Sequence, residues 1–296
     1  MSTQSNTALG ITFNVIASIL FALMFAYTSL LQSLNGNEIY GWRILLTFPC
    51  LTLFITLQGG WSQVISIYKR LYNERYFFLT RFLSSSLIGV QLWLFMWAPS
   101  NGYGLDLSLG YFMMPITMVI LGRIAFKDNM SRLQKLSCIF AILGIINMLV
   151  ISKTLTWPTL LICLGYPIYF WLRQKTNTNN IGGLWVDMML SLPVSIFFIF
   201  KGDVVLSEEL DTLWLVLGLG LISALALGFQ SLSAAYLNLS LFGLLVYVEP
   251  VLLLAFSILL GETIKPAEWA TYIAIWLAVC ALMLEGILSL KKNSFT

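Results

Sequence analysis

The sequence predicts an all-α membrane protein of ten transmembrane helices, arranged as two inverted five-helix repeats. Three observations lead to this prediction: the composition, the length of the apolar runs and a pair of similar proline-containing segments. Of the 296 residues, 59% are hydrophobic and 10% are charged, whereas a soluble domain of this length needs far more charged surface. The apolar runs are about 20 residues long and lack the alternation of barrel strands, so we expect helices.

Ten apolar runs are candidates for membrane spans. Each has about the length that crosses a hydrocarbon core roughly 30 Å thick. The expected spans are 9–31, 38–57, 76–97, 105–126, 133–152, 156–173, 183–201, 213–235, 241–260 and 268–290. The longest connection, 58–75, is amphipathic and rich in aromatic residues, so we expect it to lie at the membrane interface in contact with lipid.

The distribution of lysine and arginine predicts the orientation. With the N-terminus inside, the inner loops and the C-terminal tail hold eleven of the sixteen Lys and Arg residues, and the outer loops hold three. Positive charge gathers on the cytoplasmic side of membrane proteins. Both termini are therefore expected in the cytoplasm.

Two spans resemble one another. The fourth contains LSLGYFMMP and the ninth contains LSLFGLLVYVEP, so Pro115 and Pro250 occupy matching positions. Five spans per half is an odd number, which requires the second half to be inverted, as in many secondary transporters. We expect repeats at 1–154 and 155–296, with the two prolines as hinges. Two unrelated proline kinks are the alternative.

Several classes of function are disfavoured by missing residues. The chain contains no histidine, which removes histidine-based catalysis and the commonest metal ligand. It also lacks the GxxxxGK[ST] phosphate loop. We therefore expect no enzyme, no cofactor, no metal site, no use of ATP and no nucleic-acid partner. All four cysteines fall inside apolar runs, so we expect no disulfides.

The segments that carry a family resemblance are spread over both halves of the chain. They are the Arg43 segment, Leu92-Trp93-Leu94-Phe95 with Trp97, Ser108–Pro115, Asp187 with Leu192-Pro193, and Tyr247 with Pro250. With these segments the chain resembles the EamA type of the drug/metabolite transporter superfamily, and within it the RarD-type, chloramphenicol-sensitivity permeases. The resemblance implies a permease of the bacterial inner membrane with a central cavity lined by both halves. Relatives export amino acids and similar metabolites.

The chain departs from the family pattern in three places. Trp42 replaces the histidine of a His-Arg pair in the second span, and Lys127-Asp128 stands where the first-half helix usually ends in Gly-Glu. Glu249 replaces the glycine before the second proline. This last change adds a charge to the expected cavity.

Glu249 is the most informative single residue. It lies roughly 12 Å into the ninth span, at a depth where a carboxylate is costly unless it faces a wet cavity or a partner. Loss of hydration disfavours its charged form, so it is a candidate to exchange protons with the transport cycle or to hold a substrate ammonium. A structural ion pair is the alternative.

Arg43 lies roughly 7 Å inside the second span. It is a candidate anchor for a substrate carboxylate, because a guanidinium matches that group with two parallel hydrogen bonds. Alternatively its long side chain extends to the interface or pairs with Glu38.

Six further residues inside spans are candidates for substrate contact. A buried amide needs a partner, and tyrosine and tryptophan combine an apolar ring with a polar group. The candidates are Gln91, Trp93, Tyr111, Tyr169, Asp187 and Tyr247. Asp187 has the alternative of facing the loop that carries Arg173 and Lys175. Tyr247 and Glu249 are two residues apart, so a regular helix would point them in nearly opposite directions.

The function expected from these observations is secondary transport. The chain would move a small, amino-acid-like metabolite or an amphipathic drug outward, with the proton gradient or the substrate gradient as the driving force. A facilitator or channel is the first alternative, and an intramembrane enzyme or receptor is the second. We expect a monomer or a weak homodimer.

Overall fold

The computed structural model describes residues 2–31, 33–152, 155–202, 210–249, 251–252 and 266–294, and within these residues it contains helices and no strand. The helices are α1 (Ser2–Thr28), α2 (Gly36–Leu57), α3 (Trp61–Asn73), α4 (Phe77–Ser100), α5 (Gly104–Phe126), α6 (Arg132–Ser152), α7 (Trp157–Lys175), α8 (Ile181–Phe200), α9 (Leu210–Tyr236), α10 (Leu239–Leu245) and α12 (Trp269–Ser294), with a 3₁₀ turn at Pro266–Glu268.

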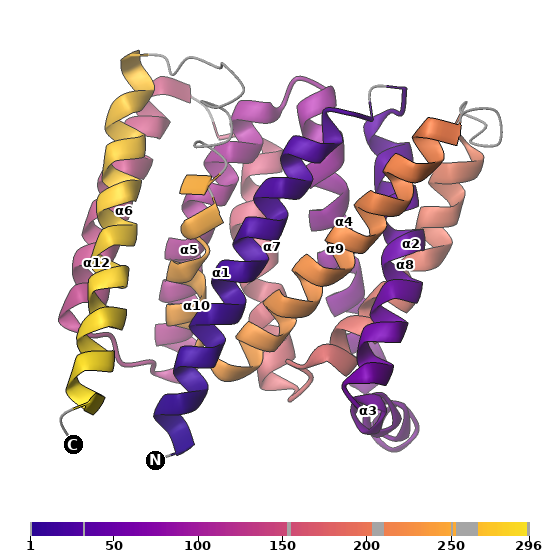
Figure 1. Ribbon diagram of the computed structural model, residues 1–296, viewed down its shortest axis with the longest axis horizontal. Helices are drawn as coiled ribbons and strands as arrows, with labels where there is room; N and C mark the ends of the chain where they lie inside the picture. Colours follow the sequence, from indigo (N-terminus) through magenta and orange to yellow (C-terminus); the bar gives the residue numbers. More distant parts are fainter. Residues whose placement is uncertain are drawn as a thin grey trace.

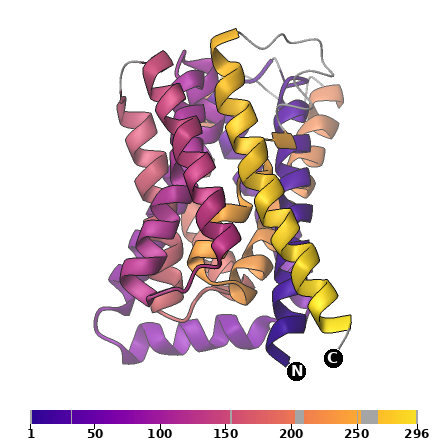
Figure 2. The ribbon, with the colours of Figure 1, turned by 90° about the vertical axis from the view of Figure 1, so that its left-hand side faces the viewer.

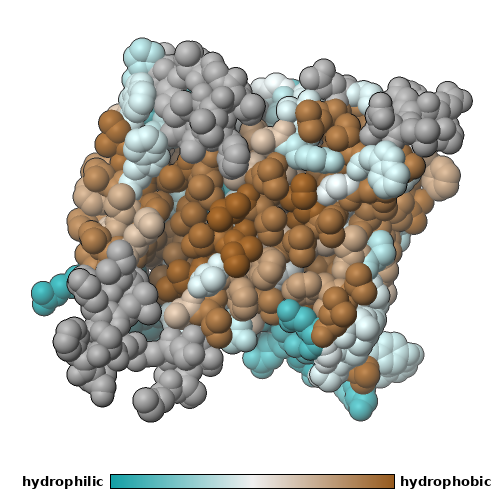
Figure 3. All heavy atoms as spheres, in the orientation of Figure 1, coloured by the Kyte–Doolittle hydropathy of each residue, from teal (hydrophilic) through white to brown (hydrophobic). Residues whose placement is uncertain are grey.

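Eight helices in the described part of the chain are long and apolar enough to cross a membrane: α1, α2, α4, α5, α6, α8, α9 and α12. Large apolar side chains cover the outside of the bundle, as Figure 3 shows for one face. The expectation of an all-helical, multi-pass membrane protein is therefore confirmed. The count of ten spans stays a prediction, because α7 is not among the eight and the expected span 241–260 lies partly outside the described residues.

Both chain termini lie at the same end of the bundle, which we call the termini face (Figures 1 and 2). The short helix α3 lies across this face rather than along the bundle. It has one buried residue, Ile67, while Tyr68 and Tyr72 are exposed. This arrangement fits the interfacial segment expected at 58–75. That the termini face is cytoplasmic remains a prediction.

The helices that contain the two similar segments pack against each other in the middle of the molecule (Figure 1). Gly243 of α10 sits so close to α5 that a Cβ atom there would collide with Met118. α5 continues as a helix through Pro115. The two segments are therefore neighbours in space, as an inverted repeat would place them.

α10 ends early. After Leu245 the backbone tightens, and the amides of Val246, Tyr247 and Glu249 each bond to the carbonyl three residues before, as in a 3₁₀ helix. The Val246 carbonyl, which Pro250 deprives of its α-helical donor, accepts from Glu249. Pro250 itself, one of the two expected hinges, lies outside the described residues.

α9 forms another close contact in the core. Along one side of α9, Gly220 faces Leu46 of α2 and Gly228 faces Phe54 of α2. Small residues at such spacing let two helix backbones approach closely. The contact fixes α2 against α9, and Arg43 of α2 is thereby directed at a defined stretch of α9.

Candidate functional site

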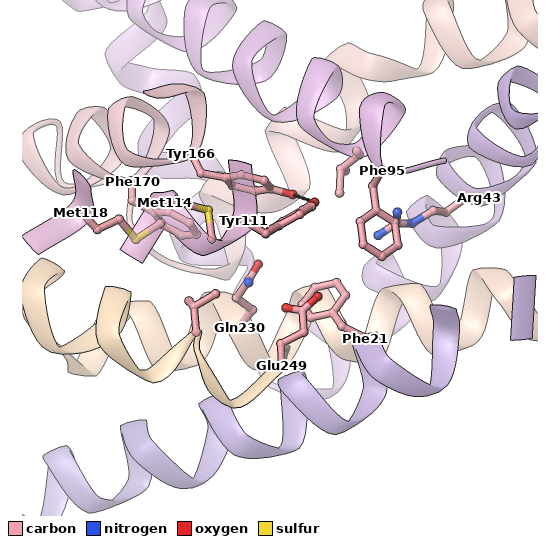
Figure 4. A pocket seen from close by; sticks show the side chains of 12 residues that line it. Phe21, Arg43, Phe95, Tyr111, Met114, Met118, Tyr166, Phe170, Gln230 and Glu249 are labelled. Carbon is pink, nitrogen blue, oxygen red and sulfur yellow. Dashed lines mark hydrogen bonds between the residues drawn. The ribbon is translucent and has the colours of Figure 1, made fainter. Parts of the chain in front are cut away.

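A cavity lies in the centre of the bundle. Side chains of α1, α2, α4, α5, α7 and α9 enclose it together with the turn that follows α10 (Figure 4). Its lining residues are Phe21, Arg43, Leu92, Phe95, Tyr111, Met114, Met118, Tyr166, Phe170, Gln230, Val246 and Glu249. Three of the predicted substrate-binding residues are among them: Arg43, Tyr111 and Glu249.

Arg43 supplies the positive charge of the cavity. Its side chain is 1% exposed, and its Nε donates to the hydroxyl of Ser223 on α9 at 2.9 Å. The guanidinium lies 5.7 Å from the centre of the Phe95 ring, within the range of a cation–π contact. Its Nη1 is buried and has no hydrogen-bond partner in the described structure. Donor capacity is thus left over for an anionic ligand.

Glu249 supplies the negative charge. Its side chain is 8% exposed, and no described residue hydrogen-bonds to or forms an ion pair with its carboxylate. The two pairs in the described part of the chain are Arg70–Glu74 and Arg81–Asp187. In Figure 4 the carboxylate lies between Phe21 and Gln230, facing the Tyr111 and Tyr166 side chains.

Two tyrosines form the polar wall opposite Glu249. The hydroxyls of Tyr111 on α5 and Tyr166 on α7 are 3.5 Å apart, and their ring centres are 6.0 Å apart. Phe95 meets the Tyr111 ring edge-on, with 5.9 Å between the ring centres. The rings fix the hydroxyls where both can bond to a polar ligand group.

The part of the cavity away from Arg43 is apolar. Met114, Met118 and Phe170 gather there, on the left of Figure 4. Methionine adapts to apolar ligands of different shape because its side chain is flexible. The cavity is therefore amphipathic: a charged and hydroxylated part adjoins an apolar part.

Three predicted site residues hold helices together outside this cavity. Gln91 of α4 donates to the carbonyl of Leu161 on α7 at 2.8 Å, and Trp93 donates to the Asn37 side chain on α2 at 2.8 Å. Tyr247 is buried in another part of the core, where its hydroxyl donates to the carbonyl of Phe112 at 2.8 Å. Tyr247 and Glu249 therefore point to different surroundings, as the regular-helix argument anticipates. None of the three lines the cavity.

Asp187 and Tyr169 belong to a buried network nearer the termini face. Asp187 is fully buried and forms an ion pair with Arg81. Its carboxylate also accepts from the Tyr169 hydroxyl at 3.2 Å and from the Ser84 hydroxyl at 3.4 Å. Arg173 donates to the Tyr169 oxygen at 2.7 Å. Asp187 is thus engaged by protein groups and does not line the cavity.

Sequence reasoning missed several lining residues. Gln230 is a polar residue in an otherwise apolar span, which is the signal that drew attention to Gln91. Tyr166 lies just before Pro167 in a span with two tyrosines, and only the packing of α7 shows that it faces the cavity. Phe21, Met114, Met118 and Phe170 carry no distinguishing signal, because they are apolar residues in apolar runs. Within the described residues, no group of three or more His, Cys, Asp or Glu is placed to hold a metal ion.

A bundle of apolar helices around an enclosed amphipathic cavity defines a multi-pass membrane protein, and comparison with known proteins gives its class. The chain is 36% identical over 281 residues to an uncharacterized transporter of Haemophilus influenzae, covering 94% of each chain. It is 33% identical over 289 residues to the chloramphenicol-sensitive protein RarD of Pseudomonas aeruginosa, covering 96% of this chain and 97% of that one. The chain therefore belongs to the RarD-like family of membrane transporters.

Two further comparisons concern family models and solved structures. No protein-family model matches the chain. One solved crystal structure aligns with a TM-score of 0.64 over 98% of this chain and 99% of that chain, at 13% sequence identity. At that identity the match shows a shared fold.

Proposed function

We propose that this protein is a secondary transporter of the drug/metabolite transporter superfamily that moves a small, amino-acid-like metabolite across the bacterial inner membrane. One observation carries the proposal: Arg43 and Glu249 are both buried, face one cavity, and do not pair with each other. Isolated charges inside a membrane protein are costly, and they mark substrate pathways when they face a cavity.

The two charges specify the ends of a zwitterion. Arg43 has an unpartnered nitrogen that can donate to a substrate carboxylate. The Glu249 carboxylate has no ion pair in the described structure and can bind a substrate ammonium. The tyrosine hydroxyls and Gln230 add neutral hydrogen-bonding groups. Met114, Met118 and Phe170 would accept an apolar side chain. We infer that the preferred substrates carry both charges and an apolar group.

Alternating access is the mechanism we propose, with the two repeats moving relative to each other around the cavity. The packing of α5 on α10 and the early end of α10 support hinges at Pro115 and Pro250. The excess of lysine and arginine in the loops at the termini face supports a cytoplasmic location for both termini. Reporter fusions test the orientation: an external C-terminus would contradict it.

An amphipathic drug is the second candidate substrate. The apolar part of the cavity favours it, and the relative in Pseudomonas aeruginosa is named for chloramphenicol sensitivity. Chloramphenicol is uncharged, so it would not need Arg43 and Glu249. The dependence of binding on these two residues therefore distinguishes the two substrate classes.

Uptake into proteoliposomes tests the proposal. A panel of labelled L-amino acids and labelled chloramphenicol is offered to the reconstituted protein, with and without a pH gradient. We expect accumulation of amino acids with large apolar side chains, and its reduction in Arg43→Gln. Uptake no faster than in protein-free liposomes for every compound would contradict the proposal.

A further inference from the structure

Besides Arg43 and Arg81, a third buried arginine lies between the central cavity and the termini face. Arg173, near the end of α7, is 1% exposed. Its Nε donates to the carbonyl of Thr178 at 3.1 Å and its Nη1 to the hydroxyl of Tyr169 at 2.7 Å. Its Nη2 donates to the carbonyl of Asn180 and, at 3.3 Å, to the hydroxyl of Ser231 on α9. All of these acceptors are neutral.

The network around Arg173 holds a surplus of positive charge. Within the described residues it combines two arginines, Arg81 and Arg173, with one carboxylate, Asp187. Arg81 forms the ion pair with this carboxylate, while Arg173 reaches it only through the Tyr169 hydroxyl. A buried charge without a counter-ion is costly, and an anion beside Arg173 would offset that cost.

Arg173 also borders a second pocket. This small cavity is lined by Arg173, Tyr169 and Ser231, among other residues. It shares Phe170 and Gln230 with the central cavity. The two cavities therefore adjoin, and a ligand group that leaves the central one past Gln230 arrives beside Arg173.

One stripe of α9 connects the two arginines. Ser223 accepts a hydrogen bond from Arg43, and Ser231 accepts one from Arg173. Eight residues separate the two serines, which corresponds to about 12 Å along the helix. Gln230 lies on the same side of α9, because positions seven and eight residues apart share a helix face with the first. Both guanidinium groups thus contact serines on one side of α9.

We propose that Arg173 and Ser231 form a second anion-binding site. This site holds the carboxylate of the transported molecule while the molecule moves between Arg43 and the termini face. This inference rests on the proposed function. The site favours anionic and zwitterionic substrates over cationic ones, because a cation would add to the surplus charge of the network. The second site thus makes charge selection a two-step process.

A purely structural role for Arg173 makes different predictions. Its bonds to Thr178 and Asn180 hold the loop between α7 and α8. Loss of that clamp would be independent of charge and would not be rescued by lysine, which lacks the guanidinium fork. Thr178→Val serves as the matched control, because Thr178 accepts a side-chain hydrogen bond from Arg81 at 2.8 Å but does not line the small cavity.

The experiment measures equilibrium binding and counterflow of ¹⁴C-labelled L-phenylalanine, which combines a carboxylate, an ammonium and an apolar ring. Arg173→Gln should bind phenylalanine with wild-type affinity, because the site at Arg43 is intact. It should exchange phenylalanine roughly tenfold more slowly, because a charge-assisted hydrogen bond is lost between Arg43 and the termini face. Arg173→Lys should restore most of the rate, and Thr178→Val should keep it. Ser231→Ala and Gln230→Leu should each slow exchange several-fold. These two variants test the second site if Arg173→Gln does not fold.

Three results would overturn the second site. They are wild-type exchange in Arg173→Gln, equal slowing in Arg173→Lys and Arg173→Gln, and slowing in Thr178→Val as large as in Arg173→Gln. If Arg173→Gln does not fold, wild-type exchange in both Ser231→Ala and Gln230→Leu has the same meaning. Failure of the wild-type protein to bind or exchange phenylalanine would instead count against the proposed function, and the second site would fall with it.

Discussion

The central cavity and the network around Asp187 both bury charged residues, yet they differ in how completely these charges are satisfied. Arg43 keeps an unpartnered nitrogen, and Glu249 has no ion pair in the described structure. Asp187, in contrast, is held by an arginine and two hydroxyls. Burial therefore does not distinguish the two regions. The ion pair does, because Arg81 and Asp187 pair with each other whereas Arg43 and Glu249 do not.

The largest effect, a loss of stability, is expected from breaking the ion pair between Arg81 and Asp187. Asp187→Asn should destabilise the protein by about 3–5 kcal/mol, because it leaves the Arg81 charge buried without its counter-ion. Thermal unfolding of the purified protein in detergent measures the loss. The double variant Arg81→Met/Asp187→Leu is the control and should recover most of the stability, since both charges are removed. Single and double variants of equal stability would show that the ion pair is not what holds this region.

Removal of the Arg43 charge should have the opposite effect: stability is kept and substrate binding is weakened. Arg43→Gln is expected to keep or raise the unfolding temperature, because a buried and incompletely satisfied charge is removed. It should weaken phenylalanine binding roughly 10- to 100-fold, the range that a hydrogen bond to a charged group represents. Ser223→Ala, which removes only the partner of Nε, is the matched control and should have a smaller effect on binding. A large loss of stability in Arg43→Gln would place Arg43 with the structural charges.

Loss of one cavity hydroxyl should have a modest effect. In Tyr166→Phe the ring stays in place and the 3.5 Å contact with Tyr111 is lost. Because this contact is long, we expect a change of less than about 1 kcal/mol in stability and less than roughly fivefold in affinity. Tyr169→Phe is the comparison in the network around Asp187. It should cost more stability, since it removes a donor to Asp187 and an acceptor for Arg173. The opposite ranking would contradict the distinction between the two regions.

The smallest effect is expected for the ion pair on α3. The hydrogen bond from Arg70 lowers the pKa of Glu74, so any stabilisation is present at neutral pH and lost as the pH falls through the lowered pKa. The Arg70 side chain is half-buried and that of Glu74 is exposed, so water screens the attraction. Glu74→Gln should therefore leave the unfolding temperature and its pH dependence unchanged, and a clear shift would show that α3 contributes more to stability than its exposure suggests.

How much of this could be predicted from the sequence depends on the kind of residue. The all-helical membrane class follows from the composition and the long apolar runs. The proposal that Arg43 and Glu249 bind the substrate began from charges placed inside these runs. The same signal also selected Asp187, and it could not exclude this residue as a ligand-binding group because the partner, Arg81, lies 106 positions away in the chain.

The packing of the helices decides which aromatic residues face the cavity. Tyr166 and Tyr169 lie three residues apart on α7, and the first lines the central cavity while the second joins the buried network. Residues three apart are neighbours on a helix surface, so sequence spacing alone cannot tell which of these two tyrosines reaches the cavity. The same limitation explains why Trp93 and Gln91 were expected in a cavity that they do not line.

If Arg43 and Glu249 hold the two ends of a zwitterion, Glu249→Gln should remove the contact to the ammonium and spare the contact to the carboxylate. The measurement is the binding of labelled L-phenylalanine and of labelled phenylacetate, which has the ring and the carboxylate but no ammonium. We expect a loss of roughly tenfold or more for phenylalanine and an unchanged affinity for phenylacetate. Equal losses for both compounds, or wild-type affinity for phenylalanine in a well-folded variant, would contradict this expectation.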